Sequence, residues 1–185
     1  MTEKKITSLS PATKEVLGYA CSCSQELAEK AIQGANEAFK KWSVTPLEER
    51  ARALRKLARL VEENRYYIDA WNVEESGKNW GEADGELCEL LDFINSYVMH
   101  MNNLEKGLEL VPTDEYTKCI YIPIGVGVAV PPWNFPLSLI GGMVAAAVVT
   151  GNSIVCKPSS DSPIVAYKFV ELCEKAGIPA GVVNY

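Results

Sequence analysis

The chain has 185 residues, of which 48% are apolar and 23% are charged, and this balance excludes disordered and fibrous proteins. Its formal net charge is -6, so there is no surplus of lysine and arginine to neutralise phosphates. We therefore expect a globular protein with no nucleic-acid partner.

Residues 1–107 are predicted to form a helical segment. Apolar residues at helical spacing predict a first helix over residues 24–42, capped by Ser24 or by Ser22 together with Gln25. Its inward face is predicted to be Leu27, Ala31, Ala35, Ala38, Phe39 and Trp42.

A second helix is predicted to begin with a capping box, in which Thr45 is the N-cap, Pro46 the first helical residue and Glu48 the third. A third helix is predicted to end at Gly77, because glycine readily adopts the left-handed conformation that ends helices. The apolar positions of this third helix are Tyr67, Ile68 and Trp71.

A fourth helix is predicted from about Glu82 to Lys106, ending at Gly107. Five acidic residues in its first half are expected to form a solvated face that also complements the helix dipole. They are Glu82, Asp84, Glu86, Glu89 and Asp92.

The periodicity changes after Gly107. Two short strands, 108–111 and 117–122, are predicted around a turn at 112–114. A βαβαβ run follows: strand 124–130, helix 137–150, strand 153–156, helix 163–176 and strand 182–185. These strands are short and rich in Val and Ile, which indicates an α/β fold with a Rossmann-like parallel sheet covered by helices on both faces. The apolar helix is too short to cross a bilayer, so we expect no membrane partner.

Two turns follow the first two strands of this run. Residues 131–136 read PPWNFP, and residues 157–162 read KPSSDS. Ligands of open parallel sheets bind beyond the carboxyl ends of the strands. We therefore expect both turns to line one crevice.

The turn residues allow two interpretations each. Asn134 either donates a hydrogen bond to charge developing on a carbonyl oxygen or caps the helix that follows. Lys157 either holds the ribose or phosphate oxygens of a dinucleotide or is an ordinary solvated lysine. Ser159 and Ser160 either donate to a ribose or serve as turn and cap residues.

Other catalytic patterns are missing from the sequence. Gly125 and Gly127 are not followed by a third glycine in the spacing of the dinucleotide fingerprint. The only histidine, His100, has no paired acid or nucleophile nearby, so neither a serine triad nor a metal site is indicated. The six cysteines form no CxxC pair, which favours reduced thiols in a cytoplasmic protein.

Both turns in their βαβαβ setting resemble the coenzyme-binding region of the aldehyde dehydrogenase superfamily. The resemblance covers IPIGVGVAVPPWNFPLSLIGGMVAAAVVTGNSIVCKPSSDSP and AGIPAGVVNY, and the A-x-x-A-F-x-x-W pattern at Ala35–Trp42 also fits. The helix EADGELCELLDFINSYV is most similar to the branch that oxidises 1-pyrroline-5-carboxylate. The resemblance implies that residues 108–185 are the first part of a coenzyme-binding domain, incomplete at its C-terminal end.

The resemblance also implies roles for the turn residues. Asn134 would form the side-chain half of the oxyanion hole, and Pro132 and Trp133 would touch the cofactor with their backbone. Lys157 would bind the adenosine ribose of NAD or NADP. Ser159 and Ser160 would lie beside it in the turn.

Two positions depart from the family's pattern. Many NAD-preferring members carry a glutamate where this chain has Ser160, so strict NAD preference is not implied. Pro131 stands where a serine is common, which removes one hydroxyl contact to the cofactor. The family's nucleophilic cysteine and general-base glutamate match no residue here, so this chain by itself is predicted to be inactive.

The resemblance leads to two hypotheses. In the first, the chain is part of an enzyme that oxidises a small-molecule aldehyde, such as glutamate semialdehyde or succinate semialdehyde, to an acid with NAD or NADP and assembles as a homo-oligomer. In the second, it is a non-catalytic dinucleotide-binding or assembly module. Tyr185 is expected to lie on a strand with an open apolar edge, so the isolated chain is expected to aggregate or bind partners.

Overall fold

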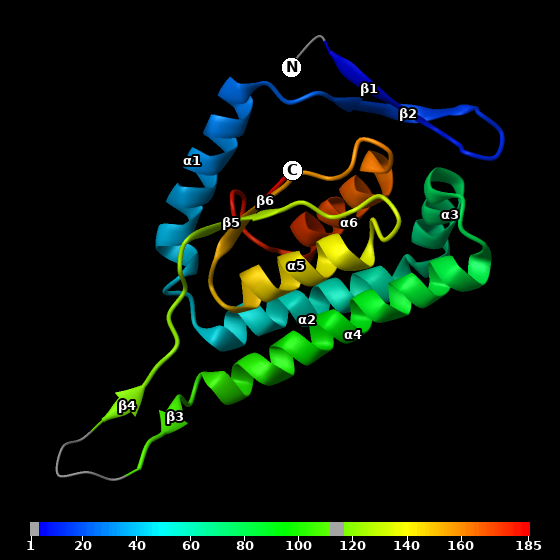
Figure 1. The fold of residues 1–185 in the computed structure, drawn as a ribbon. Helices are drawn as coiled ribbons and strands as arrows, with labels where there is room; N and C mark the ends of the chain where they lie inside the picture. Colours follow the sequence, from blue (N-terminus) through cyan, green and yellow to red (C-terminus); the bar gives the residue numbers. More distant parts are fainter. Residues whose placement is uncertain (1–3, 112–116) are drawn as a thin grey trace.

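The computed structural model describes residues 4–111 and 117–185, which form six helices and seven strands in three sheets (Figure 1). Two of these sheets are antiparallel hairpins, and the third is parallel. The elements in chain order are β1 (Lys5–Leu9), β2 (Val16–Cys21), α1 (Gln25–Trp42), α2 (Leu47–Glu63), α3 (Arg65–Ser76), α4 (Trp80–Leu104), β3 (Leu108–Glu109), β4 (Lys118–Cys119), β5 (Val126–Ala129), α5 (Ser138–Val149), β6 (Ser153–Cys156), α6 (Pro163–Ala176) and β7 (Val183–Asn184).

The parallel sheet has the order β5-β6-β7, which confirms the predicted βαβαβ run. The first and last strands are shorter than predicted, because their ends lie outside the hydrogen-bonded ladder. Helix α1 contacts β5 and β6 from one side, and α5 contacts them from the other (Figure 1). Two helical layers therefore enclose the strands, as the Val- and Ile-rich sequence indicates.

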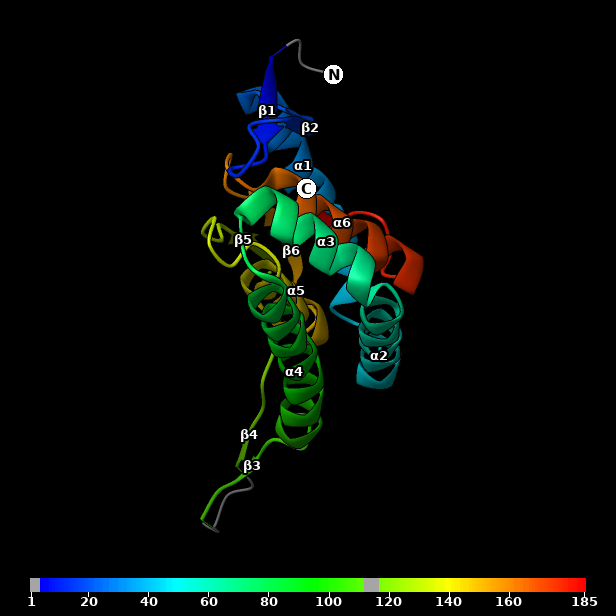
Figure 2. The ribbon, with the colours of Figure 1, turned by 90° about the vertical axis from the view of Figure 1, so that its right-hand side faces the viewer.

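The hairpin β1–β2 was not predicted from the sequence. Its strands pair antiparallel, from Lys5 with Cys21 to Leu9 with Val16. Most of its side chains are exposed or half-buried, so the alternation of apolar and polar residues that marks a strand is weak. Figure 2 shows the hairpin at the opposite end of the molecule from β3–β4. The turn predicted at residues 112–114 lies outside the described residues.

The helix starts agree only in part with the sequence patterns. Ser24 caps α1, and its hydroxyl accepts a hydrogen bond from the backbone N–H of Leu27. The capping box predicted for α2 is wrong: Pro46 is the N-cap, and the Thr45 hydroxyl donates to the carbonyl of Lys41 at 3.0 Å. The Thr45 hydroxyl therefore bonds the end of α1 and does not cap α2.

The fourth helix begins earlier than predicted. Asn79 is its N-cap, and Asn79 and Glu82 form a complete capping box. The helix therefore starts at Trp80 rather than near Glu82, and it ends at Leu104 before the left-handed Gly107. A capping box identifies a start only where both partners bond backbone N–H groups.

The inward faces of α1 and α3 also differ from the predictions. Leu27, predicted to face inward on α1, lies in the first turn of the helix and is 38% exposed. Tyr67, predicted on the apolar face of α3, is 52% exposed. The buried side of α3 is mostly polar: Ile68, Asp69, Asn72 and Glu75. Helix α3 therefore brings polar groups into the interior.

Helix α5 is almost entirely apolar, and side chains from other helices cap both of its ends. The Arg50 guanidinium donates from Nε to the carbonyl of Val149 at 2.9 Å, and Trp42 Nε1 donates to the carbonyl of Val148 at 3.0 Å. A cation at a helix C-terminus complements the helix dipole. The N-terminal helices thus supply polar partners that α5 lacks.

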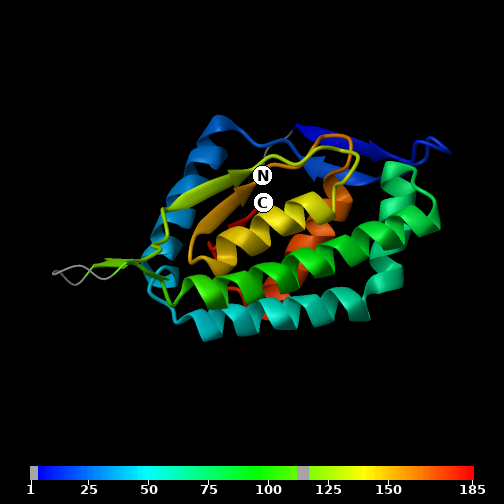
Figure 3. The same cartoon turned by 60° about the horizontal axis from the view of Figure 1, so that its bottom comes forward.

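One hydrophobic core joins the helices on both sides of residue 107. It includes Leu54 and Leu57 of α2, Leu90 of α4, and Phe169 of α6, all fully buried. Helices α4 and α5 approach closely, since a Cβ on Gly141 would lie 2.1 Å from Leu90 Cδ1. Figure 3 shows α2, α4 and α5 running side by side. Within the described residues, no helix has the length and apolar character needed to cross a bilayer.

Candidate functional site

The two predicted turns lie at neighbouring strand ends. Strands β5 and β6 are adjacent and parallel, with Ala129 opposite Cys156. The backbone N–H of Lys157, the first residue of the second turn, donates to the carbonyl of Ala129 at 2.9 Å. Both turns therefore leave the sheet at the same edge, and the crevice that they are expected to share stays a prediction. We call residues 131–136 the asparagine corner and residues 157–162 the lysine corner.

The asparagine corner is anchored at both ends and open in the middle. Pro131 and Pro136 are buried, whereas Pro132, Trp133 and Asn134 are exposed. Helix α5 has Leu137 as its N-cap and no hydrogen bond from the side chain of that residue. The first N–H groups of the helix, those of Leu137 and Ser138, donate to another residue, so the alternative that Asn134 caps this helix is wrong and its amide remains available to a ligand.

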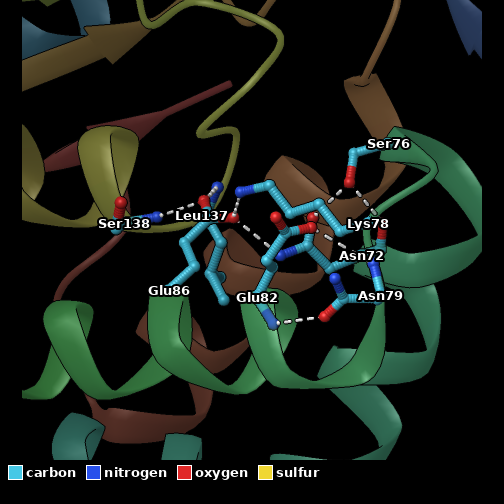
Figure 4. Close-up of polar contacts among 8 residues, drawn as sticks. All are labelled: Asn72, Ser76, Lys78, Asn79, Glu82, Glu86, Leu137 and Ser138. Atoms are coloured by element: carbon cyan, nitrogen blue, oxygen red, sulfur yellow. Dashed lines mark hydrogen bonds and ion pairs between the residues drawn. The ribbon is translucent and has the colours of Figure 1, made fainter.

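The cap of α5 comes from an acidic residue that was predicted to face solvent. Glu86 is 3% exposed, so its placement on a solvated acidic face is wrong. Its Oε1 accepts hydrogen bonds from the backbone N–H groups of Leu137, at 2.8 Å, and Ser138, at 2.9 Å (Figure 4). These N–H groups have no partner inside the helix, and the carboxylate satisfies them and complements the helix dipole.

The second oxygen of Glu86 is also fully engaged. Oε2 accepts a hydrogen bond from Asn72 Nδ2 at 2.7 Å and pairs with the ammonium of Lys78 (Figure 4). The side chain of Lys78 is only 13% exposed, so the ion pair is largely shielded from water. The Lys78 ammonium also lies 4.2 Å from the ring centroid of Phe135 in the asparagine corner.

The lysine corner presents polar groups to solvent. Lys157 is exposed, and its ammonium donates to the carbonyl of Pro158 at 3.0 Å. The Ser159 hydroxyl accepts from the backbone N–H of Asp161 at 3.3 Å, and Ser160 is exposed. The first serine thus also serves as a turn residue.

A second buried glutamate caps the helix that follows the lysine corner. Glu75 of α3 accepts from the backbone N–H of Ile164, at 2.9 Å, and of Val165, at 2.7 Å. The Ser8 hydroxyl of β1 donates to the same carboxylate at 2.6 Å. Burial raises the pKa of Glu75, although these three donors act in the opposite direction. Ser162, the N-cap residue of α6, makes no cap with its own side chain.

A hollow of about 460 Å³ lies between α4 and the asparagine corner. It is lined by Lys78, Glu82, Gly85, Glu86, Glu89, Asn134 and Phe135. Two exposed acids, a shielded ion pair, an aromatic ring and the amide of Asn134 therefore share one space. No cysteine is among these lining residues.

The cysteines of the sheet and of α6 are poor nucleophiles. Cys156 ends β6 next to the lysine corner, but burial raises the pKa of its thiol to about 12. Burial also raises the pKa of Cys173 well above its ordinary value. All six cysteines are free, as the sequence indicates.

The sequence contained a signal for the buried glutamates that the charge pattern obscured. Glu86 lies three residues after the buried Ala83 and four before the buried Leu90, so it shares their helical face. Glu75 lies seven residues after Ile68 on the inward side of α3. An acid at an inward helical position therefore marks a candidate buried cap.

Known proteins of similar sequence and structure were found over the whole chain. The 1-pyrroline-5-carboxylate dehydrogenase of Geobacillus thermodenitrificans is 46% identical over 187 residues, which cover 100% of this chain and 36% of that protein. A crystal structure of 1-pyrroline-5-carboxylate dehydrogenase from Thermus with bound NAD has a TM-score of 0.95 at 37% identity, over 100% of this chain and 36% of that one.

A third relative is a crystal structure of the NADP-dependent glyceraldehyde-3-phosphate dehydrogenase of Bacillus halodurans complexed with NADP. It has a TM-score of 0.92 at 32% identity, over 98% of this chain and 39% of that one. The chain thus spans little more than a third of the length of these relatives. Residues 1–185 match the description "Aldehyde dehydrogenase family" throughout. The chain belongs to the aldehyde dehydrogenase family.

Proposed function

We propose that the protein containing this chain oxidises an aldehyde to a carboxylate with NAD or NADP. One observation carries the proposal: Asn134 lies on a turn anchored by buried prolines, at the strand edge it shares with Lys157, and it does not cap the following helix. A side-chain amide held free at this edge is suited to bind a substrate oxygen.

Asn134 would act through its amide N–H. When a nucleophile adds to the carbonyl carbon of an aldehyde, negative charge develops on the oxygen, and a preorganised donor stabilises that charge. The hollow beside Asn134 offers space for the aldehyde. None of the residues lining it is a thiol, which supports our inference that the 185-residue chain alone does not oxidise aldehydes.

The lysine corner would hold the cofactor through its ribose. Both helix N-termini at this edge are occupied by Glu75 and Glu86, so these amides are not available for a pyrophosphate. The exposed ammonium of Lys157 and the hydroxyls of Ser159 and Ser160 fit the hydroxyls of a ribose instead. When bound, NAD(P) would accept the hydride of the aldehyde.

The remaining contacts would come from the backbone of the asparagine corner. Pro132 and Trp133 are exposed beside Asn134, and their backbone would touch the cofactor. The proposed substrate is glutamate semialdehyde, in equilibrium with 1-pyrroline-5-carboxylate, because two relatives that match this chain over its whole length are named 1-pyrroline-5-carboxylate dehydrogenase. The proposed assembly is a homo-oligomer.

The test is an assay of the protein as its gene encodes it. Formation of reduced nicotinamide is followed with NAD and with NADP, and L-1-pyrroline-5-carboxylate is compared with succinate semialdehyde. Asn134→Ala is expected to lower kcat by about 100- to 1000-fold, as loss of one oxyanion donor does. Lys157→Ala is expected to raise the KM for the dinucleotide with little change in kcat. Absence of aldehyde oxidation in the unmodified protein would refute the proposal.

A further inference from the structure

We propose that Glu86, together with Lys78, is a positioning residue that sets the orientation of Asn134. The inference rests on the proposed function, because it concerns the amide that would bind the substrate oxygen. Glu86 itself is buried, lines the same hollow as Asn134 and makes no hydrogen bond with it among the described residues, so it would act through the backbone of the corner.

The first hold on the corner is the pair of backbone hydrogen bonds to Glu86 Oε1. Leu137 and Ser138 follow Asn134 by three and four residues, and their N–H groups donate at 2.8 and 2.9 Å. One carboxylate oxygen thus fixes the point where the corner becomes α5 (Figure 4). A shift of this point would move the whole of residues 131–136.

The second hold is the Lys78 ammonium, which lies 4.2 Å from the ring centroid of Phe135, the residue next to Asn134. The same ammonium pairs with Glu86 Oε2, which also accepts from Asn72 Nδ2 at 2.7 Å. The carboxylate of Glu86 therefore takes part in both interactions. It cannot rotate without breaking the hydrogen bonds of Oε1 to the start of α5 and those of Oε2 to Lys78 and Asn72. Its side chain has 0% exposure, so water cannot replace the lost partners.

The side chain of Asn134 is not fixed by a protein partner among the described residues. Its side chain is exposed, and among the described residues no hydrogen bond to it is found. The backbone that Glu86 and Lys78 fix therefore sets the position and direction of the Cα–Cβ bond of Asn134, from which its amide reaches the substrate oxygen. A misplacement of about 1 Å in a catalytic group can lower a rate by about 100-fold.

A purely structural role for Glu86 makes a different prediction. If Glu86 only stabilised α5, its loss would reduce the amount of folded enzyme and leave kcat per folded molecule unchanged. If it positions Asn134, its loss would lower kcat only while the Asn134 amide is present. The two roles are separated by a double-mutant cycle.

The cycle combines Glu86→Gln with Asn134→Ala in the protein as its gene encodes it. The carboxylate of Glu86 accepts from four donors, whereas a glutamine side chain carries one accepting oxygen and one NH2 donor. The variant therefore loses either the hydrogen bonds to the start of α5 or the interactions with Lys78 and Asn72. Glu86→Gln alone is expected to lower kcat at least about 10-fold, with the dinucleotide KM changed by less than about threefold. In the Asn134→Ala background, the same substitution is expected to lower kcat by less than about twofold.

Lys78 supplies a second variant that leaves the helix cap in place. Lys78→Met is expected to lower kcat. Lys78→Arg is expected to retain most of it, because a guanidinium can keep both the ion pair with Glu86 and the contact with Phe135. Hydrogen–deuterium exchange of residues 131–140 gives a readout independent of activity, and it should accelerate in Glu86→Gln and Lys78→Met.

The outcomes are distinguishable. An unmodified protein without aldehyde oxidation would sink the proposed function. An active protein in which the losses from Glu86→Gln and Asn134→Ala multiply independently would overturn the positioning role alone. The same holds if Glu86→Gln or, should that variant not fold, Lys78→Met leaves kcat unchanged.

Discussion

The asparagine corner and the lysine corner are built on one plan but held with different chemistry. Each follows a parallel strand, precedes a helix, and ends where a buried glutamate from the N-terminal helices caps that helix. Glu86 is paired with the ammonium of Lys78. Glu75 accepts a hydrogen bond from the neutral hydroxyl of Ser8, and no cation pairs with it in the part of the chain that the structure describes.

This difference affects both stability and freedom of movement. An ion-paired carboxylate with four donors is strongly tied to one geometry, and removing it leaves a shielded cation without its counter-charge. Glu75 has only neutral donors, and burial raises the pKa of its carboxyl group although those donors act in the opposite direction. The proposed charge-stabilising amide thus lies on the more rigidly held corner.

The largest expected effect comes from removing each carboxylate in turn. Glu86→Ala is expected to lower the free energy of unfolding by about 3–5 kcal/mol, because it strands the Lys78 ammonium and two backbone N–H groups. Glu75→Ala is expected to cost about 1–3 kcal/mol, since it strands only neutral donors. Urea unfolding of both variants measures the difference. Equal losses would show that the ion pair does not distinguish the corners.

The close contact of α4 with α5 supplies the next largest effect. Gly141→Ala is expected to cost about 1–3 kcal/mol, because its Cβ would lie 2.1 Å from Leu90 Cδ1 and separate the helix that carries Glu86 from the helix it caps. Gly85→Ala on α4 is the matched control. A Cβ there meets nothing within 4 Å, so the variant is expected to gain up to about 1 kcal/mol.

The pH dependence of stability should separate the corners further. The folded chain keeps a proton on Glu75 to higher pH than the unfolded chain does, so stability falls as the pH rises from about 4.5 through the raised pKa. Glu75→Gln, which costs about 1 kcal/mol at low pH, should remove this decline. The difference in the free energy of unfolding between the unmodified chain and Glu75→Gln therefore becomes smaller as the pH rises.

Thermal unfolding of the two proteins between pH 4 and pH 8 tests this expectation. Ser8→Ala serves as a control that keeps the carboxyl group but removes a donor that opposes the rise in its pKa. In this variant the decline of the free energy of unfolding should extend to higher pH. An advantage that widens with rising pH would mean that Glu75 is held as a carboxylate.

The smallest expected effect concerns the exposed residues of the site. Lys157→Ala and Asn134→Ala should each change the free energy of unfolding by no more than about 0.5 kcal/mol, because both side chains are exposed. Their stability is measured beside their kinetics. A large decrease in the free energy of unfolding of either variant would mean that the residue stabilises the fold of its turn rather than binding a ligand.

Much of this architecture was predictable from local patterns. The βαβαβ order, the left-handed glycines that end α3 and α6, and the two corners at one sheet edge follow from periodicity, glycine placement and the geometry of parallel strands. The strands, helices and glycine stops depend on residues within a few positions of one another, and the common edge follows because a short βαβ unit allows only a parallel pairing. For that reason a single sequence suffices to predict them.

The chemistry that fixes the corners was decided only by the tertiary structure. Glu86 bonds N–H groups 51 and 52 positions away, and Glu75 bonds N–H groups 89 and 90 positions away. The charge pattern along α4 predicted Glu86 to be solvated, and no local pattern marked Glu75. The folded chain buries them because the ends of α5 and α6 carry backbone donors that no residue of their own caps, and a buried donor without a partner is costly.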